Sequence, residues 1–194
     1  DEALYNFDMA AVYENFVSQM SDDQGKNGNI PIYVPNDGQC MGVGGNNCSG
    51  CPLPYNPNFD TGCSDIGWTL AFPAIVEAVY NYTGDTRLMK TQYDNLKRYT
   101  DNLVAVAKTR PHLVADCDRW GDWVPPASCN MNDGAACPVF SLIAGFSYVK
   151  GLDIMSRVAN ALGHASDSDR YRGLADTARA GYHARFFDES IQAY

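Results

Sequence analysis

The sequence lacks a long apolar run, an excess of positive charge and, for most of its length, strand-like alternation. No apolar run in its 194 residues approaches the roughly 18 residues of a membrane-spanning helix, so we expect no membrane segment. Lys and Arg number 14 against 23 Asp and Glu, and the formal net charge of −9 argues against nucleic acid and anionic lipid as partners. The chain also starts without Met and without a signal peptide, which indicates a mature, processed or partial sequence.

Helical periodicity dominates the chain, and only "IPIYV" (30–34) alternates like a short strand. The first predicted helix, 3–20, is apolar on more than one side, which predicts burial. Gly84 should end a helix over 68–82, and Asp85-Thr86 should cap the next one. The remaining apolar stripes predict three helices: one carrying Met89 to Val106, one over 140–162 that ends at Gly163, and one carrying Tyr171 to Tyr182. The sequence therefore predicts an all-α domain, or a large piece of one.

Connections between these helices are alternately long and short. About 45 residues separate the first two helices and about 30 the third and fourth, whereas the other links are a few residues, which makes their neighbours antiparallel. If the long links also join antiparallel helices, both of them emerge at the same end of the bundle. An all-helical bundle with one elaborated face is typical of the (α/α) toroids that act on carbohydrates.

The seven cysteines lie in the two long connections and outside the predicted helices. This distribution indicates disulfides that staple loops, and hence an oxidising, extracellular setting. A zinc site is disfavoured because the spacing does not form two knuckles, and we expect no metal and no cofactor. An odd count leaves one thiol free or paired outside the chain. The sequons at Asn47 and Asn81 permit glycosylation. The cysteines are Cys40, Cys48, Cys51, Cys63, Cys117, Cys129 and Cys137.

Two segments of these connections combine tryptophan with aspartate: "GCSDIGW" (62–68) and "DRWGDW" (118–123). Sugar recognition uses flat apolar rings against C–H faces and carboxylates against hydroxyls. We therefore expect Asp65, Trp68, Asp122 and Trp123 to bind a ligand. Asp65 could instead cap a helix, Trp68 could belong to the core, and Trp123 could fill a surface gap. Asp116 and Asp118 are expected to be solvated, and the three histidines are given no role.

Several stretches resemble the catalytic domain of the α-L-rhamnosidases of glycoside hydrolase family 78. They are "EALYNFDMAAVYENFV" (2–17), "GWTLAFPAIVEAVYNYTGDTRLMKTQYDNLKRYTDNL" (67–103), "WGDWVPP" (120–126) and "ALGHASDSDRYRGLADTARAGYHARFFDESIQAY" (161–194). The Cys-rich insertions around 40–63 and 117–137 depart from the family. The resemblance implies part of an (α/α)6 barrel over 1–194, which hydrolyses terminal α-L-rhamnosides with inversion. It also implies that Trp68 and Trp123 contact the rhamnose ring.

The catalytic residues implied by this resemblance are not found in the chain. The general acid belongs to an Asp-Cys-Pro-x-Arg-Glu segment expected upstream, and neither Cys51-Pro52 nor Cys137-Pro138 continues into Arg-Glu. The general base is expected beyond Tyr194. We therefore name no catalytic residue, expect the chain alone to be inactive, and count the remainder of the parent polypeptide among its partners, with a carbohydrate substrate.

Two alternatives remain open at this stage. One is another (α/α) barrel carbohydrate enzyme, since "GDW" and a toroid pattern do not fix the sugar. The other is a non-catalytic sugar-binding or structural helical module. A calcium scaffold on "SDDQGKNGN" and "NMNDG" is disfavoured because no terminal Glu completes a ligand loop, and these stretches are better explained as turns.

Overall fold

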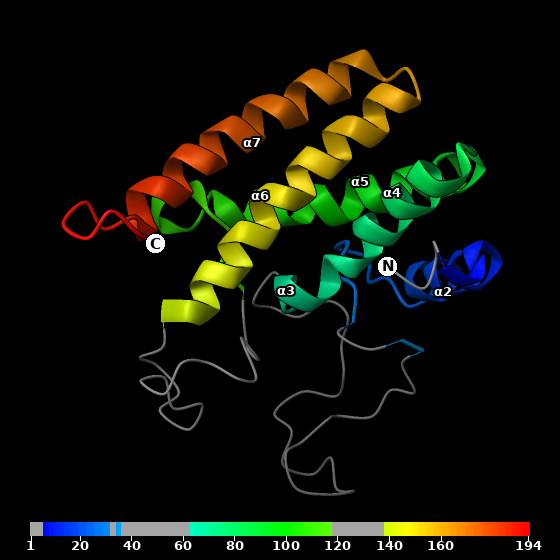
Figure 1. Cartoon of the computed structure of the whole chain (residues 1–194), viewed down its shortest axis with the longest axis horizontal. Helices are drawn as coiled ribbons and strands as arrows, with labels where there is room; N and C mark the ends of the chain where they lie inside the picture. Colours follow the sequence, from blue (N-terminus) through cyan, green and yellow to red (C-terminus); the bar gives the residue numbers. More distant parts are fainter. Residues whose placement is uncertain (1–5, 32–33, 36–62, 118–137) are drawn as a thin grey trace, which may run out of the picture.

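The computed structural model describes residues 6–31, 34–35, 63–117 and 138–194 (Figure 1). Its described part is built from α-helices, with one short 3-10 helix and an isolated bridge between Asp188 and Ala193 near the C-terminus. This confirms the all-α prediction. The elements are α2 (Ala10–Asp22), α3 (Ile66–Thr69), α4 (Ala71–Thr83), α5 (Arg87–Ala107), η2 (Pro111–Leu113), α6 (Pro138–Ala161) and α7 (Ala165–Phe186).

Two helical hairpins, α4–α5 and α6–α7, form the body of the fold. Each turns at a glycine in the left-handed region, Gly84 with a φ of 69° and Gly163 with a φ of 79°, where a side chain would be strained. Both glycines stand where the sequence predicts helix ends. Figure 1 shows α6 and α7 side by side and antiparallel, as the short link requires.

The predicted helix over 68–82 is divided into α3 and α4 at Leu70. Pro73 explains the division. It has no N–H to donate to the carbonyl of Thr69 four residues earlier, and its ring would crowd that carbonyl. The ladder resumes when Ala74 N donates to Leu70 O at 3.1 Å. The proline therefore accounts for the missing hydrogen bond between Pro73 and Thr69 at this division.

The prediction of a buried first helix over 3–20 is wrong in two respects for its described part. Asp8 has a φ of 49°, which interrupts the helix, and α2 begins only at Ala10. Only Val17 and Met20 of α2 are buried, whereas Val12 is 56% exposed. The strand expected at 30–34 is also absent from its described positions, since Ile30, Pro31 and Val34 lie outside any strand.

The core lies mainly between α4, α5, α6 and α7, and its buried residues follow the apolar stripes that the sequence predicts. Tyr99 and Tyr171 are the largest fully buried side chains, and Phe72 meets Tyr99 edge-on with ring centroids 6.2 Å apart. Removal of this apolar area from water holds the helices together. Further buried members of these stripes are Ile75, Val76, Val79, Leu96, Leu103, Ala144, Leu152, Met155, Val158, Ala175 and Ala178.

A polar seam joins α5 to the beginning of α7. Asp167 accepts hydrogen bonds from Lys97 Nζ and from the Tyr93 hydroxyl, both at 2.7 Å. Asp101 accepts from the Tyr171 hydroxyl at 2.8 Å. The hydrogen bonds from Lys97 and then Tyr93 hold the pKa of Asp167 below its ordinary value.

We expect Asp167→Asn to destabilise the fold by about 1 kcal/mol at neutral pH, less than the roughly 1.5–3 kcal/mol usual for a hydrogen bond to a charged group, because the Lys97–Asp167 pair is partly exposed to solvent. Because the folded pKa of Asp167 is lowered, its stabilisation is present above the unfolded pKa and is lost as the pH falls through the folded pKa. The difference between variant and wild type should therefore shrink below about pH 4. Urea unfolding at pH 7 and pH 3 measures it. Asp169→Asn is the matched control, because Asp169 is 73% exposed in its pair with Arg172 and should change stability little.

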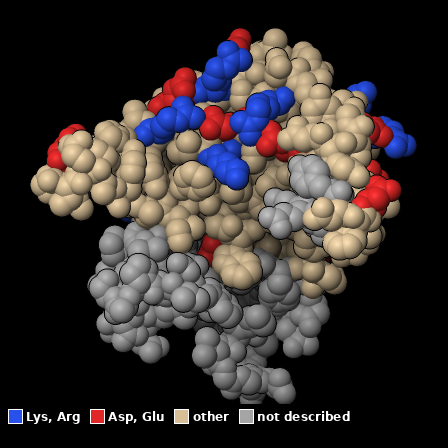
Figure 2. Space-filling view, viewed as in Figure 1, with Lys and Arg blue, Asp and Glu red and all other residues tan. Residues whose placement is uncertain are grey.

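Charged side chains gather over the α6–α7 side of the molecule, in the upper half of Figure 2. Many of them are paired: Arg157 with Glu77 at 2.6 Å, and Arg179 with Asp153 at 2.9 Å. None of the helices in the described ranges combines the length and apolar content needed to cross a bilayer.

Candidate functional site

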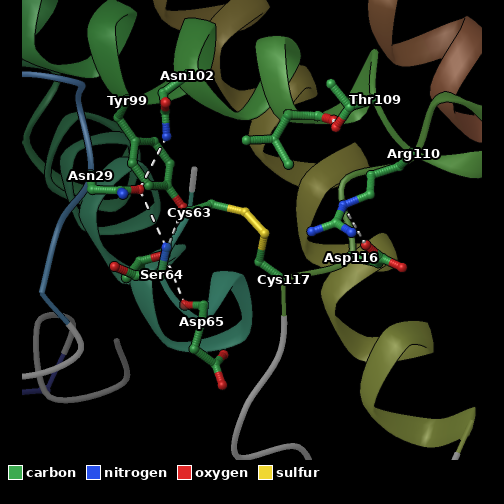
Figure 3. Close-up of a disulfide and its surroundings, with 12 residues drawn as sticks. Asn29, Cys63, Ser64, Asp65, Tyr99, Asn102, Thr109, Arg110, Asp116 and Cys117 are labelled. Carbon is green, nitrogen blue, oxygen red and sulfur yellow. Dashed lines mark hydrogen bonds and ion pairs between the residues drawn. A yellow bond between two sulfur atoms is a disulfide. The ribbon is translucent and has the colours of Figure 1, made fainter. Parts of the chain in front are cut away.

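Helices α3 and α6 both begin at one edge of the bundle, the lower edge in Figure 1, which we call the loop edge. Cys63 directly follows the segment 36–62, and Cys117 directly precedes the segment 118–137. A disulfide joins the two cysteines with a Cα–Cα distance of 6.0 Å (Figure 3). Ile66 N also donates to Cys117 O at 2.9 Å. The disulfide therefore brings one described part of each long connection together at the loop edge, in agreement with the predicted gathering of the long links at one end of the bundle.

The single turn of α3 presents Trp68 at this edge. Asp65 caps the turn, with Oδ1 accepting from Trp68 N at 3.3 Å, and its side chain is buried. Gly67 packs closely, since a Cβ there would lie 3.2 Å from Asp65 Oδ1 and 3.4 Å from Ile143 Cγ2 on α6. Trp68 is 49% exposed, so it is not a core residue. An indole half open to solvent is a surface on which an apolar ligand face can stack.

The C-terminal end of α3 is bonded to the core of the bundle. The Thr69 hydroxyl donates to Asp65 O at 2.9 Å and lies 3.0 Å from the hydroxyl of Tyr99 on α5. Both groups are buried. Burial raises the pKa of Tyr99, so its hydroxyl stays protonated and available as a donor.

A second polar contact anchors the chain just before α3. Asn29 is 1% exposed, and its Oδ1 accepts from Ser64 N at 3.3 Å and from Asn102 Nδ2 at 3.1 Å (Figure 3). Asn29 therefore links the segment after α2, the root of α3 and helix α5. The local sequence predicts only a turn at Asn29, because its partners Ser64 and Asn102 lie far away in the chain.

Asp116 is not solvated, contrary to expectation. Its side chain is 16% exposed and pairs with Arg185 of α7 at 2.8 Å and with Arg110 at 3.4 Å. Two guanidinium groups on one carboxylate replace the water that a surface aspartate would bind. These pairs fix the residue before Cys117 to α7. The expectation failed because Arg185, the nearer partner, lies 69 positions after Asp116 in the sequence.

The predicted site residues are only partly placed by the structure. Asp65 and Trp68 lie together at α3: Asp65 caps the helix, Trp68 belongs to it, and the contact of either with a ligand stays a prediction. Asn81 lies exposed on the last turn of α4. The other predicted positions lie outside the described residues: Asp122, Trp123, Asn47, Cys40, Cys48, Cys51, Cys129 and Cys137.

Sequence reasoning missed the two residues that hold α3 to α5. The apolar stripe of its helix predicts the burial of Tyr99 but not the contact of its hydroxyl, and no pattern in the sequence marks Thr69. The available signal was the presence of hydroxyl-bearing residues at positions where the stripe predicts burial, since a buried hydroxyl needs a partner. In the described ranges, no group of three His, Cys, Asp or Glu side chains is arranged to hold a metal ion.

Comparison with known proteins identifies the fold. Residues 1–193 match the family described as the bacterial alpha-L-rhamnosidase 6 hairpin glycosidase domain. The structure of alpha-L-rhamnosidase from Dictyoglumus thermophilum superposes with a TM-score of 0.74, covering 97% of this chain and 18% of that one at 23% identity. This likeness shows the helical barrel fold.

Two curated proteins of similar sequence are both named alpha-L-rhamnosidase. An alpha-L-rhamnosidase of Alteromonas sp. (strain LOR) is 22% identical over 97% of this chain, and one of Formosa agariphila is 20% identical over 95%. The chain spans 18% and 17% of the length of these two proteins. Since the family match extends over nearly every residue, the chain belongs to the six-hairpin glycosidase domain family of the bacterial α-L-rhamnosidases.

Proposed function

We propose that the chain is part of the (α/α)6 catalytic barrel of an inverting α-L-rhamnosidase that removes terminal α-L-rhamnose. The observation that carries this proposal is family membership over residues 1–193. Both curated relatives bear the name alpha-L-rhamnosidase. The alternative of a non-catalytic sugar-binding module differs from it in one measurable respect, the release of sugar.

Trp68 is the proposed sugar contact within the described residues. Trp68 is 49% exposed at the loop edge, where the Cys63–Cys117 disulfide joins the two long connections. A rhamnose ring offers apolar C–H faces that stack on indole. The resemblance extends this pocket to Asp122 and Trp123, which follow Cys117 by five and six positions. Asp65 supports the pocket by capping the turn that carries Trp68.

Inversion needs two carboxyl groups roughly 6.5–9.5 Å apart, with a water on the face of the sugar opposite the leaving group. We assign neither group to this chain and, by the resemblance, place both in segments outside residues 1–194. The chain alone is therefore expected to show no turnover. In this proposal its contribution is to bind and orient the sugar.

The proposed location is extracellular, and the proposed protein is a glycoprotein. The Cys63–Cys117 disulfide supports an oxidising compartment. Asn81 in the sequon Asn81-Tyr82-Thr83 is exposed, as a glycosylation acceptor must be. Asn47 is the second proposed acceptor. Intact mass before and after enzymatic deglycosylation tests this part of the proposal.

The full-length enzyme should release rhamnose from p-nitrophenyl α-L-rhamnopyranoside, and the β-anomer should appear first in the NMR spectrum if the reaction inverts. We expect Trp68→Ala to raise KM by about tenfold, because an aromatic stacking contact contributes about 0.5–1.5 kcal/mol beyond the apolar area that it buries, and about 1.4 kcal/mol is tenfold in affinity. Steady-state kinetics with purified wild type and variant measure the change.

Tyr82→Ala is the matched control for this substitution. Tyr82 is an exposed aromatic residue near the end of α4 farthest from α3, and its replacement should leave KM unchanged. Binding of rhamnosides without any release of sugar would replace the proposal with the non-catalytic module. An unchanged KM in Trp68→Ala would remove Trp68 from the sugar site.

A further inference from the structure

We propose that Tyr99 and Thr69 are positioning residues, which act through the turn of α3 to hold the Trp68 indole at the loop edge. This inference rests on the proposed function in one respect only, that Trp68 contacts the sugar. Neither Tyr99 nor Thr69 is placed in contact with substrate.

Helix α3 cannot hold its own position. It has four residues, Ile66–Thr69, and a helix this short is unstable without tertiary contacts. Pro73 interrupts the ladder that would otherwise join it rigidly to α4. The orientation of Trp68 therefore depends on the burial of Ile66, on the packing of Gly67 against α6, and on the hydrogen bonds that α3 makes with other elements.

Those bonds lie at both ends of the turn. At the N-terminal end, Asp65 caps the turn and Ile66 N donates to Cys117 O at 2.9 Å. At the C-terminal end, the residue after Trp68 reaches Tyr99 on α5 at 3.0 Å. Trp68 thus lies between an attachment to the neighbouring loop root and an attachment to the core.

The direction of the hydrogen bonds is fixed by counting protons. Thr69 has one hydroxyl proton, and it goes to Asp65 O at 2.9 Å. The 3.0 Å contact with Tyr99 must therefore have the tyrosine as donor. The chain of donation runs from Tyr99 through Thr69 to the carbonyl of Asp65, the residue that caps the same turn.

Packing alone does not require the Tyr99 hydroxyl. Tyr99 is 1% exposed in an apolar stripe with Leu96 and Leu103, where Phe would supply the same ring. Burying an unpaired hydroxyl is costly, so its partner on α3 is needed. The hydroxyl therefore serves the attachment of α3 to α5 rather than the apolar core.

The test compares Tyr99→Phe and Thr69→Val with Thr69→Ser in the full-length enzyme. Two quantities are measured: the hydrogen-exchange rate of the peptide covering 64–72, and KM and kcat for p-nitrophenyl α-L-rhamnopyranoside. Loss of one buried hydrogen bond should speed exchange and raise KM by about three- to tenfold, with kcat within about twofold of wild type. Thr69→Ser keeps the hydroxyl and should restore both values.

Tyr171→Phe is the matched control. Tyr171 is as buried as Tyr99, and its hydroxyl donates to Asp101 at 2.8 Å in the seam between α5 and α7, so this variant should leave exchange over 64–72 and KM unchanged. The inference is overturned if Tyr99→Phe and Thr69→Val leave exchange over 64–72 at the wild-type rate. It is equally overturned if Tyr171→Phe raises that rate as much, since the effect would then be general destabilisation.

Trp68→Ala separates this inference from the proposed function. If Trp68→Ala raises KM while Tyr99→Phe and Thr69→Val do not, the positioning role fails and the sugar site stands. If Trp68→Ala leaves KM unchanged while exchange responds as expected, the sugar contact fails and the attachment of α3 to α5 stands.

Discussion

Replacing Cys63 and Cys117 together with alanine should lower the free energy of unfolding by about 4 kcal/mol. The disulfide joins positions 54 residues apart, and a loop of this length restricts the unfolded chain by about that amount. Both α4 and α5 lie inside the loop, so the loss should appear as a lower melting temperature of the domain, followed by tryptophan fluorescence or calorimetry.

A second variant distinguishes the effect of losing the covalent cross-link from the effect of losing the buried side-chain volume of the cysteines. Cys63 is 7% exposed, and Cys63→Val with Cys117→Ala refills its space without restoring the bond. This variant should be nearly as unstable as the double alanine variant. A melting temperature within about 2 °C of wild type in both variants would show that the cross-link contributes little.

Gly181→Ala should destabilise the domain by about 3 kcal/mol, the upper end of the usual cost of overpacking. A Cβ at this position of α7 would overlap the carbonyl of His112 in η2 and come within 3.3 Å of Val114 Cγ2. The neighbouring backbone has little freedom to move away, since His112 and Leu113 already have φ values of 58° and 57°. Urea unfolding measures the change.

Gly173→Ala on the same helix is the control for this prediction. Nothing lies within 4 Å of a Cβ at Gly173, so the substitution adds only helix propensity and should stabilise the domain by about 0.5–1 kcal/mol. Equal effects of the two substitutions would contradict the close contact between α7 and η2.

The sequence predicted the end of a helix well where a single residue determines it. Gly84 and Gly163 end helices because only glycine adopts their backbone conformation without strain. The division at Leu70 was also readable from Pro73, but an apolar stripe that continues across the proline hid it. The burial of the first helix was overestimated because apolar content does not show which faces the rest of the fold covers.

The candidate site was predicted only where neighbouring residues define it. Asp65 and Trp68 are three positions apart, so a cap followed by an aromatic residue could be anticipated. The contacts of Thr69 with Tyr99, Asn29 with Ser64, and Asp116 with Arg185 join positions separated by 30 or more residues. Neither periodicity nor spacing in the sequence predicts such contacts, because they form only when the helical hairpins pack against one another.

The position of the disulfide at the open end of the α4–α5 hairpin has a consequence for oxidative folding. Seven cysteines could pair in many ways. Once α4 and α5 lie antiparallel, they bring Cys63 and Cys117 together, and the effective concentration of one thiol at the other rises far above its value in the unfolded chain. The helical hairpin thus selects its own cross-link, and thiol–disulfide exchange should return mispaired chains to this bond.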